Sequence, residues 1–178
     1  PWLSTEKFDY TGSPMISLDA NAHTQVMDER VAFLMSSILK ESLQRNANRR
    51  GLNMPIENMG GKTGTTNDAT STWFSGYASH IVASAWVGKD DGSSLGDDEF
   101  GSTNALPIWL DFMTLSKNSL TDFEVVVPEG IAAIRIDKES GNVSKSFNNS
   151  YFEYFLEENI DDLLRSKSNN SELKEILN

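Results

Sequence analysis

The sequence predicts an α+β fold in which helices flank an antiparallel sheet. Apolar residues recur at helical spacing in two segments, 28–50 and 105–118. Between them lie three short segments rich in aromatic, β-branched and glycine residues, the first two types being typical of strands. A helix, three consecutive strands and a second helix, in that order, favour helices packed on an antiparallel sheet.

The composition is that of a globular protein that forms one domain or part of a larger one. Of the 178 residues, 38% are hydrophobic and 23% are charged, and the formal net charge is −11. No basic patch offsets this charge, so nucleic acid is excluded as a partner. Cysteine is absent, and neither His23 nor His80 has a second ligand at metal-binding spacing. We therefore expect no metal and no organic cofactor.

The sequence shows no sign of a segment that inserts into a membrane. No apolar run approaches the length of about 18 residues that a spanning helix needs, and no signal peptide opens the chain. We therefore expect no membrane contact from these residues. The first residue is Pro1 rather than methionine, which favours a processed chain or an excised part of a longer one.

The first helix has clear signals at both ends. Asp28 is a preferred N-cap residue type, and Gly51 follows a basic last turn, as is typical of a helix C-terminus. The apolar positions between them are Val31, Leu34, Met35, Ile38, Leu39 and Leu43. Residues 1–27 show no sustained periodicity, so we expect them to be irregular apart from one short strand.

Three segments are predicted to form the sheet. Glycines and threonines in 59–66 indicate a strand that another group approaches closely. Segments 72–79 and 80–90 are predicted to form the next two strands, joined in a hairpin that turns near Ser79 and His80.

A polar loop, 90–104, leads into the second helix, which has Asn104 near its cap and Pro107 in its first turn, where proline is tolerated. Large apolar side chains of the strands and this helix are expected to be mainly structural. They are Trp73, Phe74, Tyr77, Val82, Trp86, Trp109 and Phe112. The alternative for Trp73 is that it lines a binding groove.

The C-terminal part has two different patterns. An alternating apolar segment followed by a turn at 139–141 predicts a small peripheral hairpin. From Tyr151 onward the chain is acidic and has the pattern of a helix. We therefore expect a peripheral hairpin followed by an acidic helical tail.

The sequence Gly61-Lys62-Thr63 is compatible with two kinds of site. A phosphate-binding loop of the pattern G-x-x-x-x-G-K-[ST] needs a glycine at position 56, which is Ile56, and a helix directly after the lysine. The residues that follow are poor helix formers, so this interpretation is disfavoured. K-T-G is also a signature of serine β-lactamases and penicillin-binding proteins.

On an exposed strand, this motif would gather groups suited to a peptide carboxylate. Thr63 and Thr65 alternate to the same face of a strand, beside the ammonium group of Lys62. Gly64 has no side chain to obstruct a substrate backbone laid along the strand. The plainer interpretation is a glycine-containing strand near a turn.

Longer collinear runs make the resemblance specific. "GGKTGTTND", "TWFSGYASHIVASAWVGKDD" and "ALPIWLDFM" resemble the C-terminal half of the transpeptidase domain in bifunctional class A penicillin-binding proteins of the 1A kind. "ERVAFLMSSILKESLQR", "VPEGIAAIRIDKESG" and "YFEYFLEEN" resemble the same family's flanking segments, so the likeness covers about residues 15–160. It implies a partial penicillin-binding protein or serine β-lactamase-like fold, with an irregular segment at 1–14, the core half at 15–120, and hairpin and tail at 121–178.

The resemblance also implies a function for the intact parent protein. Such a parent cross-links peptidoglycan stem peptides ending in D-Ala-D-Ala by serine acyl transfer, binds β-lactams, and lies at the periplasmic face of the bacterial inner membrane. Lys62 and the oxyanion-hole N–H of Thr65 would be catalytic. Thr63, Gly64, Thr65 and Thr66 would bind substrate, and the upstream half of the same domain would be a partner.

The family's nucleophile is not found in this chain. S-x-x-K occurs at Ser4, Ser37 and Ser171, but the spacing to Lys62 and the family order of S-x-x-K, S-x-N and K-T-G exclude all three. Every S-x-N follows the K-T-G; the serines are Ser102, Ser116, Ser140, Ser146 and Ser168. We therefore predict that the chain alone is inactive. The alternatives are a non-catalytic binding module derived from a transpeptidase and a serine β-lactamase-like hydrolase.

Overall fold

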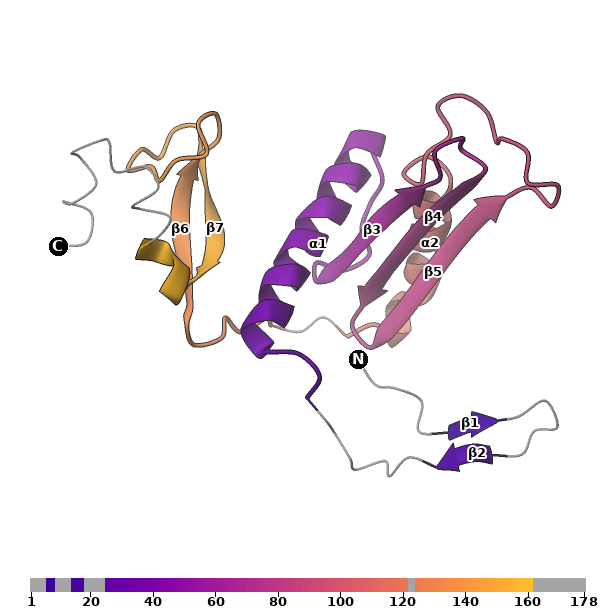
Figure 1. Ribbon diagram of the computed structural model, residues 1–178, viewed down its shortest axis with the longest axis horizontal. Coiled ribbons are helices and arrows are strands. Elements are labelled where there is room, and N and C mark those ends of the chain that lie inside the picture. Colours follow the sequence, from indigo (N-terminus) through magenta and orange to yellow (C-terminus); the bar gives the residue numbers. More distant parts are fainter. Residues whose placement is uncertain (1–5, 9–13, 18–24, 122–123, 162–178) are drawn as a thin grey trace.

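The structure, a computed structural model, describes residues 6–8, 14–17, 25–121 and 124–161 (Figure 1). The elements, in chain order, are β1 (Glu6–Phe8), β2 (Pro14–Ser17), α1 (Glu29–Arg50), β3 (Met59–Thr65), β4 (Ser71–Ala78), β5 (Ile81–Gly88), α2 (Ala105–Leu115), η1 (Lys117–Ser119), β6 (Ile131–Asp137), β7 (Ser150–Leu156) and η2 (Glu157–Asn159). No helix among these residues is long and apolar enough to cross a membrane.

Helix α1 has the predicted ends. The Asp28 side chain accepts a hydrogen bond of 2.8 Å from the Arg30 N–H, so it satisfies one of the donors that the first turn leaves unpaired. At the other end, Gly51 adopts a left-handed conformation with φ of 66°, and its N–H donates to the carbonyls of Ala47 and Asn48. Both sequence predictions are confirmed.

The central sheet has the order β3-β4-β5 and is antiparallel throughout. Its β4–β5 hairpin turns at Ser79 and His80, as predicted. Helix α2 lies behind the sheet in the view of Figure 1, and α1 lies beside β3. Strand β3 comes first in this order and is therefore an edge strand.

The core joins the sheet to both helices, because Leu43 of α1 belongs to the same buried cluster as Phe74 and Trp109. On β4, alternate side chains such as Phe74 and Ala78 are buried, and the Phe74 ring packs on Trp109 of α2 with centroids 4.8 Å apart. The indole N–H of Trp109 donates to the Ala83 carbonyl at 3.0 Å. Gly76 is required here, because a Cβ would lie 2.9 Å from the Trp109 ring and 2.6 Å from the Gly60 carbonyl oxygen.

Four of the seven side chains expected to be structural are exposed in the described part of the chain. Phe74 and Trp109 are fully buried and Tyr77 is half-buried, so the prediction is correct for these three. The others are exposed by between 44% and 74%: Trp73, Val82, Trp86 and Phe112. The first three of these lie on the sheet face opposite α2, and period-2 alternation alone could not tell which face the core covers.

The two ends of the chain also differ from expectation. One short strand was expected in 1–27, but β1 and β2 form an antiparallel pair there. The helix expected from Tyr151 onward is wrong over 151–156, where β7 pairs with β6. Four aromatic residues within β7 suit a strand, and pairing with β6 overrides the helical pattern. The remaining tail, 162–178, lies outside the described residues.

The β6–β7 hairpin is more elaborate than predicted. The turn at 139–141 exists, since Asp137 Oδ1 accepts hydrogen bonds from the Glu139 and Ser140 N–H groups and Gly141 has φ of 65°. It closes only an isolated bridge between Ile136 and Val143. The main partner, β7, begins further along the chain.

The β6–β7 hairpin packs against helix α1. The Phe33 ring meets the Tyr154 ring edge-to-face with centroids 4.9 Å apart. The Arg30 guanidinium bridges Asp28 and Glu158, with N–O distances of 3.1 and 3.0 Å. The hydrogen bond to Arg30 lowers the pKa of Asp28, and the same contact raises the pKa of Arg30.

Candidate functional site

The free edge of β3 divides into a covered and an open half. Its first three residues, Met59, Gly60 and Gly61, are buried, and α1 packs on this strand. In the second half, Lys62 and Thr65 are exposed, while Thr63 and Gly64 are half-buried. The K-T-G motif thus lies on the accessible part of an edge strand.

Lys62 and Thr63 are in direct contact although their side chains leave opposite faces of the strand. The Lys62 Nζ donates to the Thr63 carbonyl at 2.9 Å and to Thr63 Oγ1 at 3.2 Å. An exposed ammonium and a hydroxyl therefore stand together, as the sequence predicted. This pair supplies one positive charge and two kinds of donor for a carboxylate.

Thr65 is held by the polar loop before α2, through a contact that no motif indicated. The Gly101 N–H donates to Thr65 Oγ1 at 3.0 Å, which leaves the hydroxyl proton of Thr65 available for another acceptor. Gly101 is tightly placed. A Cβ there would overlap the Trp73 carbonyl oxygen and lie 2.8 Å from that of Gly64. The only signal in the sequence was a glycine three residues before the Asn104 cap.

The backbone of Thr65 is directed to the free edge. In an antiparallel ladder, residues alternate between hydrogen-bonded pairs and pairs whose N–H and C=O groups point away from each other. The Thr66 N–H donates to the Ser71 carbonyl at 3.0 Å, so Thr66 and Ser71 form a hydrogen-bonded pair. The adjacent pair, Thr65 and Thr72, is therefore of the other kind. The Thr65 N–H therefore points away from β4, as a donor to a bound ligand must.

Thr66 has a different environment from the other predicted substrate-binding residues. Its Oγ1 accepts hydrogen bonds from the N–H groups of Thr70 and Ser71, at 2.9 and 3.0 Å, and lies 2.9 Å from Thr70 Oγ1. The hydroxyl thereby stabilises the turn between β3 and β4. Substrate binding by Thr66 stays a prediction.

The serine–lysine pairs do not form a second site in the described part of the chain. Ser37 and Lys40 lie on α1, and the Lys40 Nζ donates to Asn58 Oδ1 at 3.0 Å. Ser4 and Ser171 lie outside the described residues. Within the described ranges, no three His, Cys, Asp or Glu side chains gather as metal ligands would.

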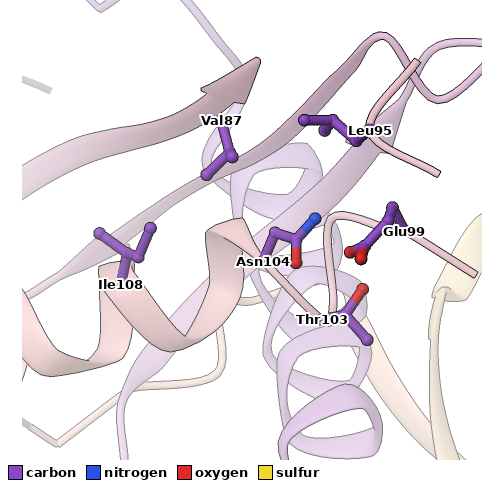
Figure 2. A pocket seen from close by; sticks show the side chains of 6 residues that line it. All are labelled: Val87, Leu95, Glu99, Thr103, Asn104 and Ile108. Carbon is purple, nitrogen blue, oxygen red and sulfur yellow. The ribbon is translucent and has the colours of Figure 1, made fainter. Parts of the chain in front are cut away.

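A depression of about 420 Å³ lies near the start of α2 (Figure 2). Its lining residues are Val87, Leu95, Glu99, Thr103, Asn104 and Ile108. The aliphatic side chains come from the end of β5, the following loop and α2, and the polar ones form the other side. The Thr103 hydroxyl is engaged with the backbone of Phe100. None of the K-T-G residues contributes to this depression.

Comparison with known proteins identifies the segment. Over 135 residues the chain is 39% identical to penicillin-binding protein 1A of Pseudomonas aeruginosa. This alignment covers 75% of this chain and 16% of the relative. It is 31% identical over 151 residues to penicillin-binding protein 1A of Rickettsia felis, covering 82% and 19%. This chain is a penicillin-binding protein 1A-like segment.

The fold agrees with this identification. The crystal structure of penicillin-binding protein 1A from Haemophilus influenzae superposes with a TM-score of 0.63 at 24% identity, over 88% of this chain and 29% of that one. The expected α+β, partial transpeptidase-like fold is therefore confirmed. No family model matches the chain. The penicillin-binding protein 1A-like segment spans less than a fifth of the length of the two relatives above.

Proposed function

We propose that this segment forms the carboxylate-binding side of a serine D,D-transpeptidase active site, in a parent that cross-links peptidoglycan stem peptides. The observation that supports the proposal most is the grouping of Lys62, Thr63 and Thr65 on the open half of the β3 edge. The similarity to penicillin-binding protein 1A gives this grouping its context.

The open edge suits a peptide that ends in a carboxylate. An extended peptide can add to the edge as a further strand, because the backbone of Thr65 points outward there. The Thr63 and Thr65 hydroxyls and the Lys62 ammonium would then hold the terminal carboxylate of D-Ala-D-Ala, or the carboxylate of a β-lactam. Gly64 leaves room for the ligand backbone.

The same edge can stabilise the transition state of the acyl transfer. A serine Oγ attacks the penultimate carbonyl of the stem peptide, and the negative charge that develops on its oxygen is held by N–H donors, one of them from Thr65. The tetrahedral intermediate collapses, D-alanine leaves with a proton on its amine, and an amine of a neighbouring stem resolves the acyl-enzyme. Loss of one such donor typically lowers the rate about 10²- to 10³-fold.

The serine is supplied by residues outside these 178. The sheet face opposite α2 exposes Trp73, Val82 and Trp86 in the described part of the chain. We assign this face to contact with the upstream half of the same domain, at the periplasmic face of the inner membrane. Exposed aromatic side chains gathered on one face are typical of a surface that another polypeptide covers.

Covalent labelling by penicillin tests the proposal. The intact parent should form an acyl adduct, and Lys62→Ala in the parent should slow its formation by at least about tenfold, because the carboxylate loses its charged partner. The matched control is Lys117→Ala, which removes a lysine from η1 outside the site. The parent with Lys62→Ala reacting at the control's rate would contradict the assigned role.

The 178-residue chain alone should form no adduct with a labelled β-lactam, as measured by intact-mass spectrometry. The reason is that no S-x-N lies between any serine–lysine pair and Lys62. A stoichiometric adduct on Ser4 or Ser37 would overturn the view that the nucleophile lies elsewhere. An unreactive parent would instead support the non-catalytic binding module.

A further inference from the structure

The β6–β7 hairpin exposes an aromatic cluster built around one arginine. The Arg135 guanidinium carbon lies 4.1 Å from the centroid of the Phe147 ring and 4.4 Å from that of Phe152. Both rings are largely exposed, by 82% for Phe147 and 58% for Phe152. We call these three residues the aromatic cluster.

The hairpin holds the aromatic cluster in place. Phe152 lies directly across from Arg135 in the β6–β7 register. Phe147 comes from the long connection, where the Ser146 Oγ accepts from the Asn148 N–H at 3.2 Å and the Ser150 hydroxyl donates to the Ser146 carbonyl at 2.6 Å. Arg135 Nη1 in turn donates to Ser150 Oγ at 3.4 Å. A surface ordered in this way loses little freedom on binding.

The hairpin itself is fixed to the body of the molecule. Tyr154, two residues after Phe152 on the same strand face, packs on Phe33 of α1. Glu158, just after β7, forms the ion pair with Arg30. The aromatic cluster is therefore presented by a docked element.

A purely structural role does not account for these contacts. A side chain that closes a loop gains stability by burying apolar surface, and Phe147 buries less than a fifth of its own. The outer faces of both rings are open. Within 124–161 the Arg135 side chain donates one hydrogen bond, to Ser150, which uses one of its five N–H groups. The cluster thus combines apolar faces with donors in a fixed plane.

The charge around the aromatic cluster limits which ligands the cluster can bind. Asp137 lies two residues from Arg135 on the same strand face, and hydrogen bonds from Ser140 lower its pKa, so it remains anionic. The chain as a whole carries −11. A polyanion would be repelled by the net negative charge, and a polycation would be repelled by Arg135. An uncharged ligand with apolar ring faces and many oxygen acceptors fits this surface best.

We propose that the aromatic cluster binds a polysaccharide of N-acetylated sugars, namely the glycan strand of peptidoglycan. The C–H face of a sugar ring would pack on the free faces of Phe147 and Phe152, and the Arg135 N–H groups would donate to hydroxyl and acetamide oxygens. The source of the glycan rests on the proposed function, because a transpeptidase acts on peptides attached to this polymer.

Co-sedimentation of the 178-residue chain tests the proposal with two insoluble probes, purified sacculi and chitin, an uncharged polymer of N-acetylglucosamine. Wild type should bind both, and Phe147→Ser and Arg135→Gln should weaken binding at least about tenfold. The matched control is Phe112→Ser on α2, which removes an equally large exposed ring elsewhere and should bind as wild type. Thermal unfolding should give Phe147→Ser an unchanged Tm, because the ring is mostly exposed.

Three results would overturn the glycan site. They are wild type that does not bind chitin, Phe147→Ser that binds as tightly as wild type, and a lowered Tm of Phe147→Ser that accounts for its weaker binding. The variant Lys62→Ala distinguishes a failure of the glycan site from a failure of the proposed transpeptidase function. It should leave glycan binding unchanged in the chain, whereas in the intact parent it slows penicillin labelling.

Discussion

Single residues decide how the K-T-G strand is presented. Lys62 and Thr63 are brought together by direct hydrogen bonds, and the K-T-G motif predicted this grouping although adjacent side chains of a strand leave opposite faces. The contact of Thr65 with Gly101 was not predictable, because the two are far apart in sequence and only folding places the loop against β3. Motifs reveal which residues belong to a site, but not the residues that position them.

Gly101→Ala should destabilise the chain by about 1 to 3 kcal/mol, because the added Cβ overlaps the Trp73 carbonyl and the loop must move away. Urea unfolding measures the change in the free energy of unfolding. Gly64→Ala is the matched control, since its Cβ would make an ordinary contact of 3.4 Å with Trp73 Cβ. Equal stability of the two variants would show that the loop yields freely.

Gly64→Ala should instead reduce penicillin labelling of the intact parent. The added methyl group projects from the face that Gly64 shares with Lys62 and Trp73, where it would crowd a ligand backbone laid along the strand. A rate of labelling equal to that of the unmodified parent would remove Gly64 from the substrate-binding residues.

At the scale of elements, sequence patterns predicted α1, the three central strands and α2 with nearly correct bounds. Their caps and turns are local, so adjacent residues specify them. Strand β7 was missed because its acidic, aromatic sequence also matches a helix, and only its pairing with β6 decides between the two. The exposed faces of the sheet were missed for the same reason, since alternation does not say which face packs on α2.

The hairpin should depend on its aromatic contact with α1. Phe33→Ala, Tyr154→Ala and the double variant form a cycle whose coupling energy should be about 0.5 to 1.5 kcal/mol, because the rings meet edge-to-face. Urea unfolding of the four proteins gives this energy. Strictly additive effects would mean that the two rings contribute independently.

The start of α1 should respond to acid through Asp28. Its pKa is lowered in the folded state by the hydrogen bond with Arg30, so the carboxylate stabilises the fold above the usual value of 3.8. That contribution is lost as the pH falls through the lowered pKa. At pH 7, Asp28→Ala should have a lower Tm than wild type, and this difference should shrink below pH 3.8.

Asp28→Asn separates the cap from the charge. Asparagine caps helices as well as aspartate does, so this variant should keep most of the Tm at pH 7 and show less of the acid dependence. A difference between wild type and Asp28→Ala that is the same at pH 7 and pH 2.5 would show that the ionised carboxylate contributes nothing.

The whole molecule has one well-covered face and one open face of its central sheet. Helix α2 buries Phe74 against Trp109, while Trp73 and Trp86, 6.2 Å apart between ring centroids, remain exposed on the other side. This asymmetry agrees with a segment that spans less than a fifth of its relatives' length. The sequence alone could not reveal this asymmetry, because alternation along a strand marks two faces without telling which one a helix covers.

Acrylamide quenching of tryptophan fluorescence should detect the open face. In the isolated chain, variants that retain only Trp73 or only Trp86 should be quenched readily, and a variant that retains only Trp109 should resist quenching. In the intact parent, the emission of Trp73 and Trp86 should become protected if the upstream half covers them. Equal quenching in chain and parent would place the upstream half elsewhere.

The open half of the β3 edge has a consequence for self-association. Unpaired N–H and C=O groups on an edge strand are a template on which any extended chain can add, including another copy of the same protein. Here α1 shields the first three residues of β3, so the accessible ladder is too short for a stable pairing between copies. The charged Lys62 further discourages such pairing. A peptide held at its end by a carboxylate can therefore bind where a second copy of the protein would gain too few hydrogen bonds to remain.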